Sequence, residues 1–366
     1  MRLTQTELAD RVGVKRQSVS MYEAGQTSPE PAVMERIATE LEQPLSYFVD
    51  DPPLEFGDSS TRFFRAFGAN TKRRNLACEV LGGWLVKSAK FLDGYVNFPP
   101  LDVPAAYVPA ASDGNYTPEE IEVAAANCRR SWGLGLGPIS NVVSLLENKG
   151  IVVSRYVIPR ESIEAFSFWN GDRPFVFLAS EKESAVRARF DAAHELGHLI
   201  LHRGIGTEDL EDNKERLRTI EREADRFANA FLLPAESFAA ELFSAKLDAF
   251  VPLKRRWKVS IQAMVVRCRQ LELIDEDQYT NLYKTISFRK WRKREPQDDV
   301  LPLEEPKLLS HAVNLLLSSG QKSADDVALA LQVNRGVIEE LCNVPAGTLH
   351  SKANISEFRP TLKANN

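Results

Sequence analysis

Two histidines and a glutamate stand at a spacing that suits a catalytic metal ion. His194, Glu195 and His198 form the pattern His-Glu-x-x-His. Residues four apart lie on the same face of an α-helix, so both imidazoles can bind one ion. Glu195 follows one position later, where its carboxylate can polarise a water molecule at the metal. The pattern predicts the site of a zinc-dependent peptidase.

A catalytic zinc ion needs three protein ligands and an open fourth position, so one more ligand must come from elsewhere in the chain. The segment 219–228 carries Glu221 and Asp225 four residues apart, again on one face of a helix. One carboxylate can bind zinc, while the other can accept a hydrogen bond from a ligand histidine and fix its tautomer. A glutamate ligand would complete a His₂Glu site.

His202, four residues after His198, allows three interpretations. It can be a third metal ligand, a hydrogen-bond partner behind a ligand, or a histidine placed at the end of a helix by the helix dipole. A straight helix drifts by ~40° for each step of four residues, so His202 points partly away from a metal held by the other two histidines. We therefore expect it to support a ligand or to end the helix.

Histidines at this spacing can also be purely structural on an amphipathic helix. The segment 192–201 is largely apolar, however. Two imidazoles and a carboxylate would be costly to bury there without a metal or hydrogen-bond partners. The surroundings of the motif therefore favour a metal site.

The helices that would carry these residues have their own sequence signals. Ser180 and Glu183 form a capping box, which predicts a helix over about residues 181–202. A second helix is predicted over about residues 215–233, where Pro234 ends it. These two helices would bring the histidines and the carboxylates together.

Strand signals precede the motif. β-branched residues predict a strand over 151–158, and Asn170-Gly171 predicts a hairpin turn between Phe166–Trp169 and Phe175–Leu178. Pro174 indicates that the second arm of this hairpin is an edge strand. An edge strand could hold an extended substrate by strand addition.

The N-terminal segment has the rhythm of two short helices joined by a tight turn. Gly13 occupies the turn, and the residues after it begin the second helix. The apolar residues that would form the small core are Leu8, Ala9, Val12, Val14, Val19 and Tyr22.

Composition sets the broad class of protein. The chain has 366 residues, 43% of them hydrophobic and 27% charged, with a net charge of −5, which suits two or three globular domains. Its four cysteines form no CxxC pair, so we expect buried or free thiols in a reducing cytoplasm. Without a signal-peptide pattern or a run of ~18 apolar residues, we expect a cytoplasmic protein with no membrane partner.

The segments 189–202 and 221–234 resemble the ImmA/IrrE family of intracellular metallopeptidases, and the similarity extends over roughly residues 117–275. The second segment is similar to that family's E-x-x-A-[ND]-x-F-A…L-[ML]-P pattern. The resemblance implies a gluzincin-like zinc site in which Glu221 is the metal ligand and Asp225 supports a ligand histidine. Glu223 matches a variable position. The resemblance to this family also implies that the substrate is a transcriptional repressor.

The segment 3–25 resembles the XRE, or lambda-repressor, type of helix-turn-helix, whose recognition helix enters the major groove of DNA. The family's opening helix should precede Leu3, so we expect the first helix to be missing from this sequence, either because the domain is truncated or because its true start lies upstream. A helix-turn-helix kept only for protein binding is the alternative. The residues that the resemblance places against phosphate and bases are Gln5 for phosphate, and Arg16, Gln17, Ser18 and Met21 for bases.

We predict a mainly α fold with a small α+β, zincin-like peptidase core, an all-α N-terminal helix-turn-helix domain and a C-terminal helical region. Pro52-Pro53 marks a linker, and Thr117 and Glu120 form a capping box that opens the peptidase core. The predicted regions are a helix-turn-helix at 1–50, a helical linker region at 51–116, the peptidase core at 117–250, a helical subdomain at 251–295 and a C-terminal helical region at 296–366.

These predictions together favour a regulator that binds DNA and uses zinc to cleave a regulatory protein. One alternative is a DNA-binding regulator whose peptidase fold is a sensor or scaffold with little turnover. Another is a toxin–antitoxin or phage-type control protein that acts by binding. Because helix-turn-helix proteins often bind DNA as dimers, a homodimer is compatible with the sequence.

Overall fold

The computed structural model describes residues 3–49, 62–64, 71–105, 114–157, 165–179, 184–205 and 213–350. The chain divides into two compact units. One unit comprises residues 1–51, 314–340 and 344–366, and the other comprises residues 52–313 and 341–343. The predicted linker at Pro52-Pro53 and the predicted cap at Ser180 and Glu183 lie outside the described residues.

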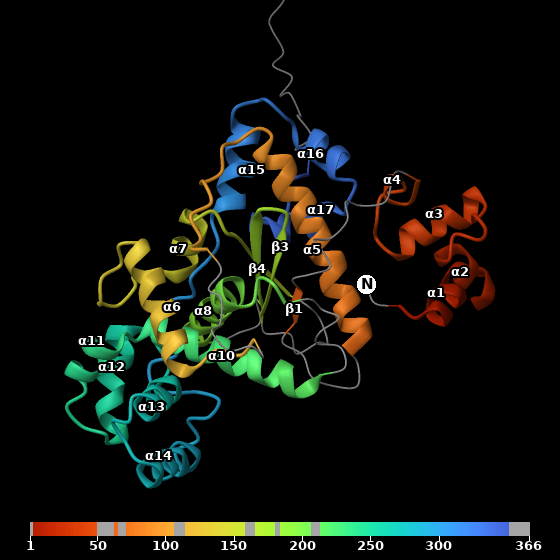
Figure 1. Cartoon of the computed structure of the whole chain (residues 1–366). Coiled ribbons are helices and arrows are strands. Elements are labelled where there is room, and N and C mark those ends of the chain that lie inside the picture. Colours follow the sequence, from red (N-terminus) through yellow and green to blue (C-terminus); the bar gives the residue numbers. More distant parts are fainter. Residues whose placement is uncertain are drawn as a thin grey trace, which may run out of the picture. The chain divides into compact units, whose positions relative to one another are not determined.

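The larger unit is built around a four-stranded sheet in the order β1-β3-β4-β2 (Figure 1). The hairpin predicted at Asn170-Gly171 is confirmed, since β3 and β4 pair antiparallel and Gly171 has a positive φ of 58°. The strand predicted over 151–158 is confirmed as β2, which runs parallel to β4. The strands are β1 Arg62–Phe64, β2 Val152–Tyr156, β3 Ala165–Asn170 and β4 Arg173–Ala179.

The prediction that β4 is an edge strand is wrong. β4 lies inside the sheet, paired with β3 on one side and with β2 on the other. Pro174 is tolerated because the register with β2 begins only at Phe175, so the proline stands before that ladder. Strand addition of a substrate to β4 is excluded by the same pairing.

The region 51–116, predicted to be a helical linker, contains a strand as well as a helix. It contains the long helix α5, Thr71–Asp93, but Arg62–Phe64 forms strand β1 and pairs antiparallel with β3. Three residues are too few to show an alternating pattern, and β3 provides the hydrogen bonds that define this strand.

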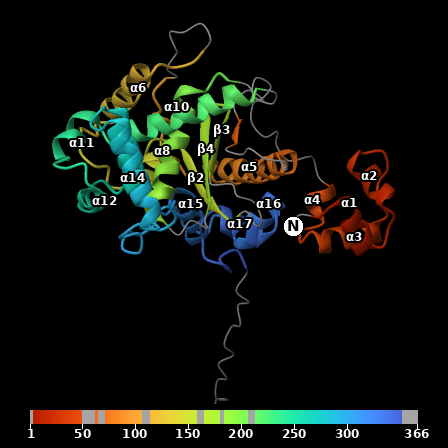
Figure 2. The same cartoon turned by 90° about the horizontal axis from the view of Figure 1, so that it is seen from below.

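The two faces of the sheet differ in their side chains. One face carries stacked phenylalanines, with ring centroids 4.8 Å apart for Phe166 and Phe177 and 5.1 Å apart for Phe168 and Phe175. The other face packs against helix α8, Ala185–Leu201. Figures 1 and 2 show α5 on the side of the sheet opposite α8. This arrangement buries the sheet on both faces and fixes the position of α8.

Helices on the α8 side complete the core. The capping box at Thr117 is confirmed, because Thr117 and Glu120 exchange side-chain and backbone hydrogen bonds at the start of α6. Gly150 links α7 to β2 with a φ of +80°, and a Cβ there would stand 2.7 Å from the carbonyl oxygen of Pro100. Only glycine fits this turn. The helices are α6 Pro118–Ser131, α7 Val142–Asn148 and α10 Lys214–Leu232.

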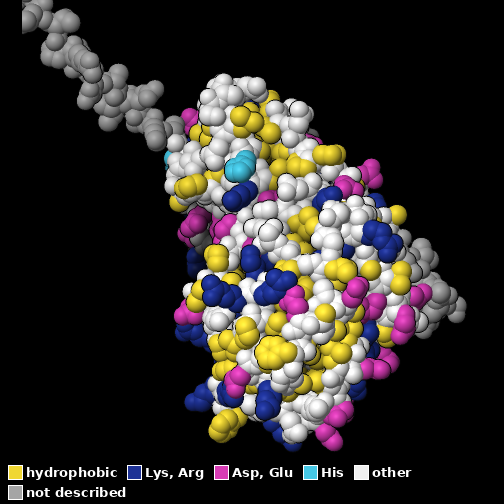
Figure 3. Space-filling model, turned by 90° about the vertical axis from the view of Figure 1, so that its left-hand side faces the viewer, with side chains coloured by type: hydrophobic (Ala, Val, Ile, Leu, Met, Phe, Trp, Pro, Cys, Tyr) yellow, Lys and Arg dark blue, Asp and Glu magenta, His cyan; other side chains and the backbone are white. Residues whose placement is uncertain are grey.

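A helical region follows α10 in the chain. Within this region, Lys254 forms buried ion pairs with Glu295 and Asp298. Asp298 also accepts a hydrogen bond from Ser184, the residue just before α8. Hydrophobic side chains gather on its outer face, in the lower half of Figure 3. The elements are α11 Ala235–Glu241, η1 Leu247–Ala249, α12 Phe250–Trp257, α13 Ile261–Gln270, α14 Glu276–Phe288 and, further on, α15 Leu308–Ser318.

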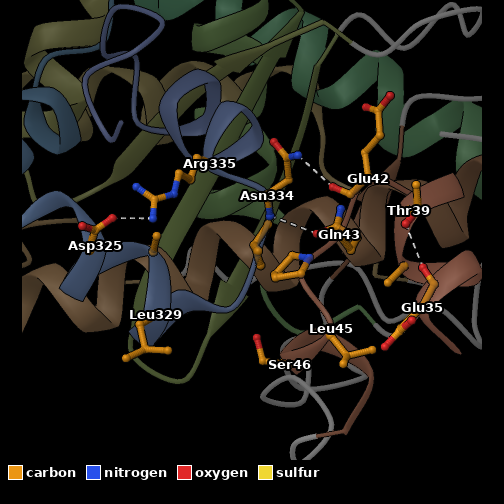
Figure 4. A pocket seen from close by; sticks show the side chains of 14 residues that line it. Glu35, Thr39, Glu42, Gln43, Leu45, Ser46, Asp325, Leu329, Asn334 and Arg335 are labelled. Carbon is orange, nitrogen blue, oxygen red and sulfur yellow. Dashed lines mark hydrogen bonds and ion pairs between the residues drawn. The ribbon is translucent and has the colours of Figure 1, made fainter. Parts of the chain in front are cut away.

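The smaller unit contains the N-terminal helices and two helices from near the C-terminus. The backbone N–H of Asn334 donates to Gln43 at 3.0 Å, and its side-chain amide donates to the carbonyl of Glu42 at 2.7 Å (Figure 4). These contacts border a groove of about 930 Å³. The helices are α1 Gln5–Val12, α2 Arg16–Glu23, α3 Pro31–Glu40, α4 Ser46–Val49, α16 Ala324–Leu331 and α17 Arg335–Leu341.

The predicted mainly α fold with a small α+β core is thus confirmed. The four cysteines are buried thiols that form no disulfide bond, as the sequence indicated. No described helix is long and apolar enough to cross a membrane.

Candidate metal centre

The candidate site lies between α8 and α10, which pack closely against each other. Gly197 permits this approach. A Cβ at this position would stand 3.2 Å from the Phe227 side chain and 3.3 Å from the Cα of Ala224. Because the two helices are so close, a side chain on α10 can reach the histidines of α8.

Three side chains converge on one point. The Nε2 atoms of His194 and His198 are 3.0 Å apart. The two carboxylate oxygens of Glu221 lie 3.4 Å from these atoms, one from each. Two imidazole nitrogens and a carboxylate match the donor set of a catalytic zinc site. Within the described part of the chain, this trio is the group whose ligand atoms lie close enough to hold a metal ion.

Asp225 orients one of the two imidazoles. Its Oδ1 lies 2.8 Å from Nδ1 of His194, so Nδ1 carries the proton and Nε2 faces Glu221. Burial opposes a charged His194, but hydrogen bonds to Asp225 and Glu221 outweigh it and raise the pKa of His194 to about 10. The same imidazoles hold the pKa of Glu221 far below its usual range, although burial opposes this. The site therefore favours positive charge where the three side chains meet, which fits a metal cation.

Glu195 is a buried carboxyl group close to the two histidines. The residue is buried, and its Oε2 has no hydrogen-bond partner among the described residues. Burial raises the pKa of its carboxyl, and the nearby imidazoles of His198 and His194 lower it only in part. A carboxylate with a raised pKa is a stronger base than an exposed one, which suits proton transfer.

His202 lies outside the three-residue cluster and is the C-cap of α8. Its Nδ1 is 3.0 Å from Nδ1 of His198, and its Nε2 is 2.9 Å from Glu223. Glu223 also accepts a hydrogen bond of 2.9 Å from the backbone N–H of Tyr116. The family resemblance seen in the sequence assigned no role to Glu223, which matches a variable position. Its position among Ile220, Ala224 and Phe227, in the apolar stripe of α10, is the signal that could have shown it to be buried.

Glu221 also borders the surface of the domain. An open depression of about 630 Å³ is lined by Glu215, Arg218, Glu221 and Arg222. Both arginines are exposed, and the side chain of Glu221 is 15% exposed. Neither arginine stood out in the sequence, because exposed arginines are ordinary on a helix surface.

The residues predicted to contact DNA lie in the smaller unit. Arg16 and Gln17 are exposed at the start of α2, while Ser18 and Met21 are half-buried on the same helix. The side-chain amide of Gln5 donates to Glu23 at 2.6 Å, which joins the start of α1 to the end of α2. The exposed N-terminal end of α2 is the part that enters the major groove in helix-turn-helix proteins.

Comparison with known families agrees with both parts of the structure. Residues 146–269 match the model of the IrrE N-terminal-like domain, and residues 1–48 match a helix-turn-helix model. No match is found among curated proteins. The first match contains all three converging side chains, and the second contains α1, α2 and α3. The chain therefore joins a helix-turn-helix domain to an IrrE N-terminal-like domain of the metallopeptidase type.

Proposed function

We propose that this protein is a DNA-binding regulator that carries a zinc-dependent endopeptidase, and that it hydrolyses a peptide bond in a repressor-like regulatory protein. The observation that carries the proposal is the convergence of His194, His198 and Glu221 beside the buried carboxylate of Glu195. A binding scaffold would need no buried carboxyl group at this position whose Oε2 lacks a hydrogen-bond partner among the described residues, because burying such an atom is costly.

The roles of the residues follow from their positions. His194, His198 and Glu221 would hold zinc, and Asp225 would keep His194 in the tautomer that binds it. Zinc, when bound, lowers the pKa of water toward neutrality and polarises a carbonyl group. Glu195 would take the proton from the attacking water and pass it to the leaving nitrogen. The depression beside Glu221 offers a route by which a peptide chain could reach these groups.

The proposal predicts cleavage that depends on zinc. A lysate from cells lacking the protein is incubated with the zinc-loaded protein, with the chelator-treated protein, or with chelator-treated protein to which zinc is restored. New protein N-termini are then identified by labelling and mass spectrometry. We expect the same small set of N-termini in the first and third samples and none in the second, because metal removal abolishes the nucleophile. Identical patterns in all three samples would disprove the peptidase.

The DNA-binding part of the proposal predicts an effect of Arg16→Ala. We select DNA ligands from a random pool with the wild-type protein and measure affinity by fluorescence anisotropy. Loss of a base contact should weaken binding to the selected sequence by ~1–3 kcal/mol, or about 5- to 150-fold, with little effect on random DNA. The control is Arg11→Ala, which removes the same charge from an exposed position on α1. Equal effects of the two variants would contradict the predicted base contact.

A further inference from the structure

A chain of three buried polar groups runs away from the candidate metal centre. Nδ1 of His198 is 3.0 Å from Nδ1 of His202, and Nε2 of His202 is 2.9 Å from Oε2 of Glu223. Each of these residues is at most 4% exposed. Oε1 of Glu223 is occupied by the backbone N–H of Tyr116, so both carboxylate oxygens act as acceptors.

The positions of the protons in this chain decide whether His198 can bind a metal. A contact between two imidazole nitrogens needs one donor and one acceptor. If His202 donated to His198, the proton of a neutral His198 would sit on Nε2 and block the metal-binding atom. If His198 donates instead, its Nε2 keeps a free lone pair. The second arrangement requires an unprotonated Nδ1 and a protonated Nε2 on His202.

We propose that Glu223 is a positioning residue that selects this second arrangement through His202. Its carboxylate accepts the Nε2 proton of His202, which makes Nδ1 of His202 the acceptor for His198. His198 is then held in the tautomer whose Nε2 faces His194 and Glu221. Glu223 thus prepares a ligand across two hydrogen bonds, on the side of the site away from the metal. This proposal rests on the metal site proposed above.

The contact with Tyr116 makes the substitution Glu223→Gln a sharp test. A glutamine has nearly the same shape, but one of its two terminal atoms is an NH₂ donor. That donor must face either the N–H of Tyr116 or Nε2 of His202. If the NH₂ group faces Nε2 of His202, the His202 proton must move to Nδ1, and His202 then donates to His198 instead of accepting from it. If the NH₂ group faces Tyr116, two buried donors are left in contact.

The first measurement is zinc affinity, by competition with a chromophoric chelator. We expect Glu223→Gln to weaken zinc binding by ~10- to 100-fold, the range seen when a hydrogen-bond partner of a metal ligand is lost. The matched control is Glu236→Gln, at an exposed position at the start of α11, which should leave affinity unchanged. His202→Phe should also weaken binding. In that background, Glu223→Gln should add less than about a twofold change, because the two residues act as one unit.

The second measurement does not depend on bound metal. The chain has only five histidines, so ¹⁵N spectra of their side chains can be assigned by substitution. In the metal-free wild type we expect His198 to be protonated at Nδ1, and in Glu223→Gln we expect a loss of this preference. Thermal unfolding of each variant checks that it is folded. If Glu223→Gln does not fold, the zinc affinity and the His198 protonation are measured in His202→Phe instead.

The two proposals fail in different ways. Unchanged zinc affinity in folded Glu223→Gln, or an undiminished effect in the His202→Phe background, would overturn the role of Glu223 and leave the metal site standing. Wild-type protein that binds no zinc would overturn both.

Discussion

Glu221→Ala is expected to lose most of its zinc, while the wild-type protein purified without added metal carries about one zinc ion per chain. Glu221 supplies the only carboxylate of the converging trio, and its two oxygens face both histidine Nε2 atoms. Its removal leaves two imidazoles, which are too few for a tight zinc site. The loss of affinity should exceed the ~10- to 100-fold typical of residues behind a ligand.

Metal content is measured by mass spectrometry of the purified proteins. Glu215→Ala serves as the control because Glu215 is an exposed glutamate on the same helix. This variant should keep its zinc. A folded wild type that contains no zinc, or a Glu221→Ala variant that keeps a full equivalent, would show that these three residues are not the metal site.

Glu195→Gln is expected to separate catalysis from metal binding. The amide has nearly the same volume as the carboxylate but cannot take a proton from water. We therefore expect zinc content to stay near the wild-type level and the rate of peptide cleavage to fall by ~10²- to 10⁴-fold, the usual contribution of a general base. The rate is measured as the appearance of the new N-terminus in a substrate found by the zinc-dependence experiment.

The same variant distinguishes the enzyme from the scaffold hypothesis. If regulation in the cell requires cleavage, Glu195→Gln should abolish it although the protein is folded and zinc-loaded. A regulator that acts only by binding should tolerate the change. Regulation that persists in full would therefore refute a role for catalysis, even if cleavage occurs in the test tube.

Local sequence patterns were sufficient for the parts of the fold that depend on neighbouring residues. The spacing of His194 and His198 required a helix, and that helix is α8. Asn170-Gly171 specified the hairpin, and Thr117 specified the start of α6. Each of these depends on hydrogen bonds or side chains within a few residues, which a sequence displays directly.

Features that depend on distant parts of the chain could not be predicted in this way. Strand β1 exists through its pairing with β3, about a hundred residues later. The interior position of β4 depends on the parallel pairing of β2, which Pro174 does not prevent. Likewise, the contact of Glu223 with His202 depends on the packing of α10 on α8. The sequence indicated which residues could bind a metal and that Asp225 could support one of them, but it did not indicate that Glu223 contacts His202.

Because Gly197 has no side chain, α8 and α10 lie close together, and the geometry of the converging side chains depends on the distance between these helices. Two of the converging ligands lie on α8 and the third lies on α10, and the space that a Cβ would need at residue 197 is taken by Phe227 and Ala224. Any strain that separates the two helices by a few tenths of an ångström would stretch the site without altering a ligand. A substitution at residue 197 that forces α8 and α10 apart would therefore disturb the converging side chains without altering any of them.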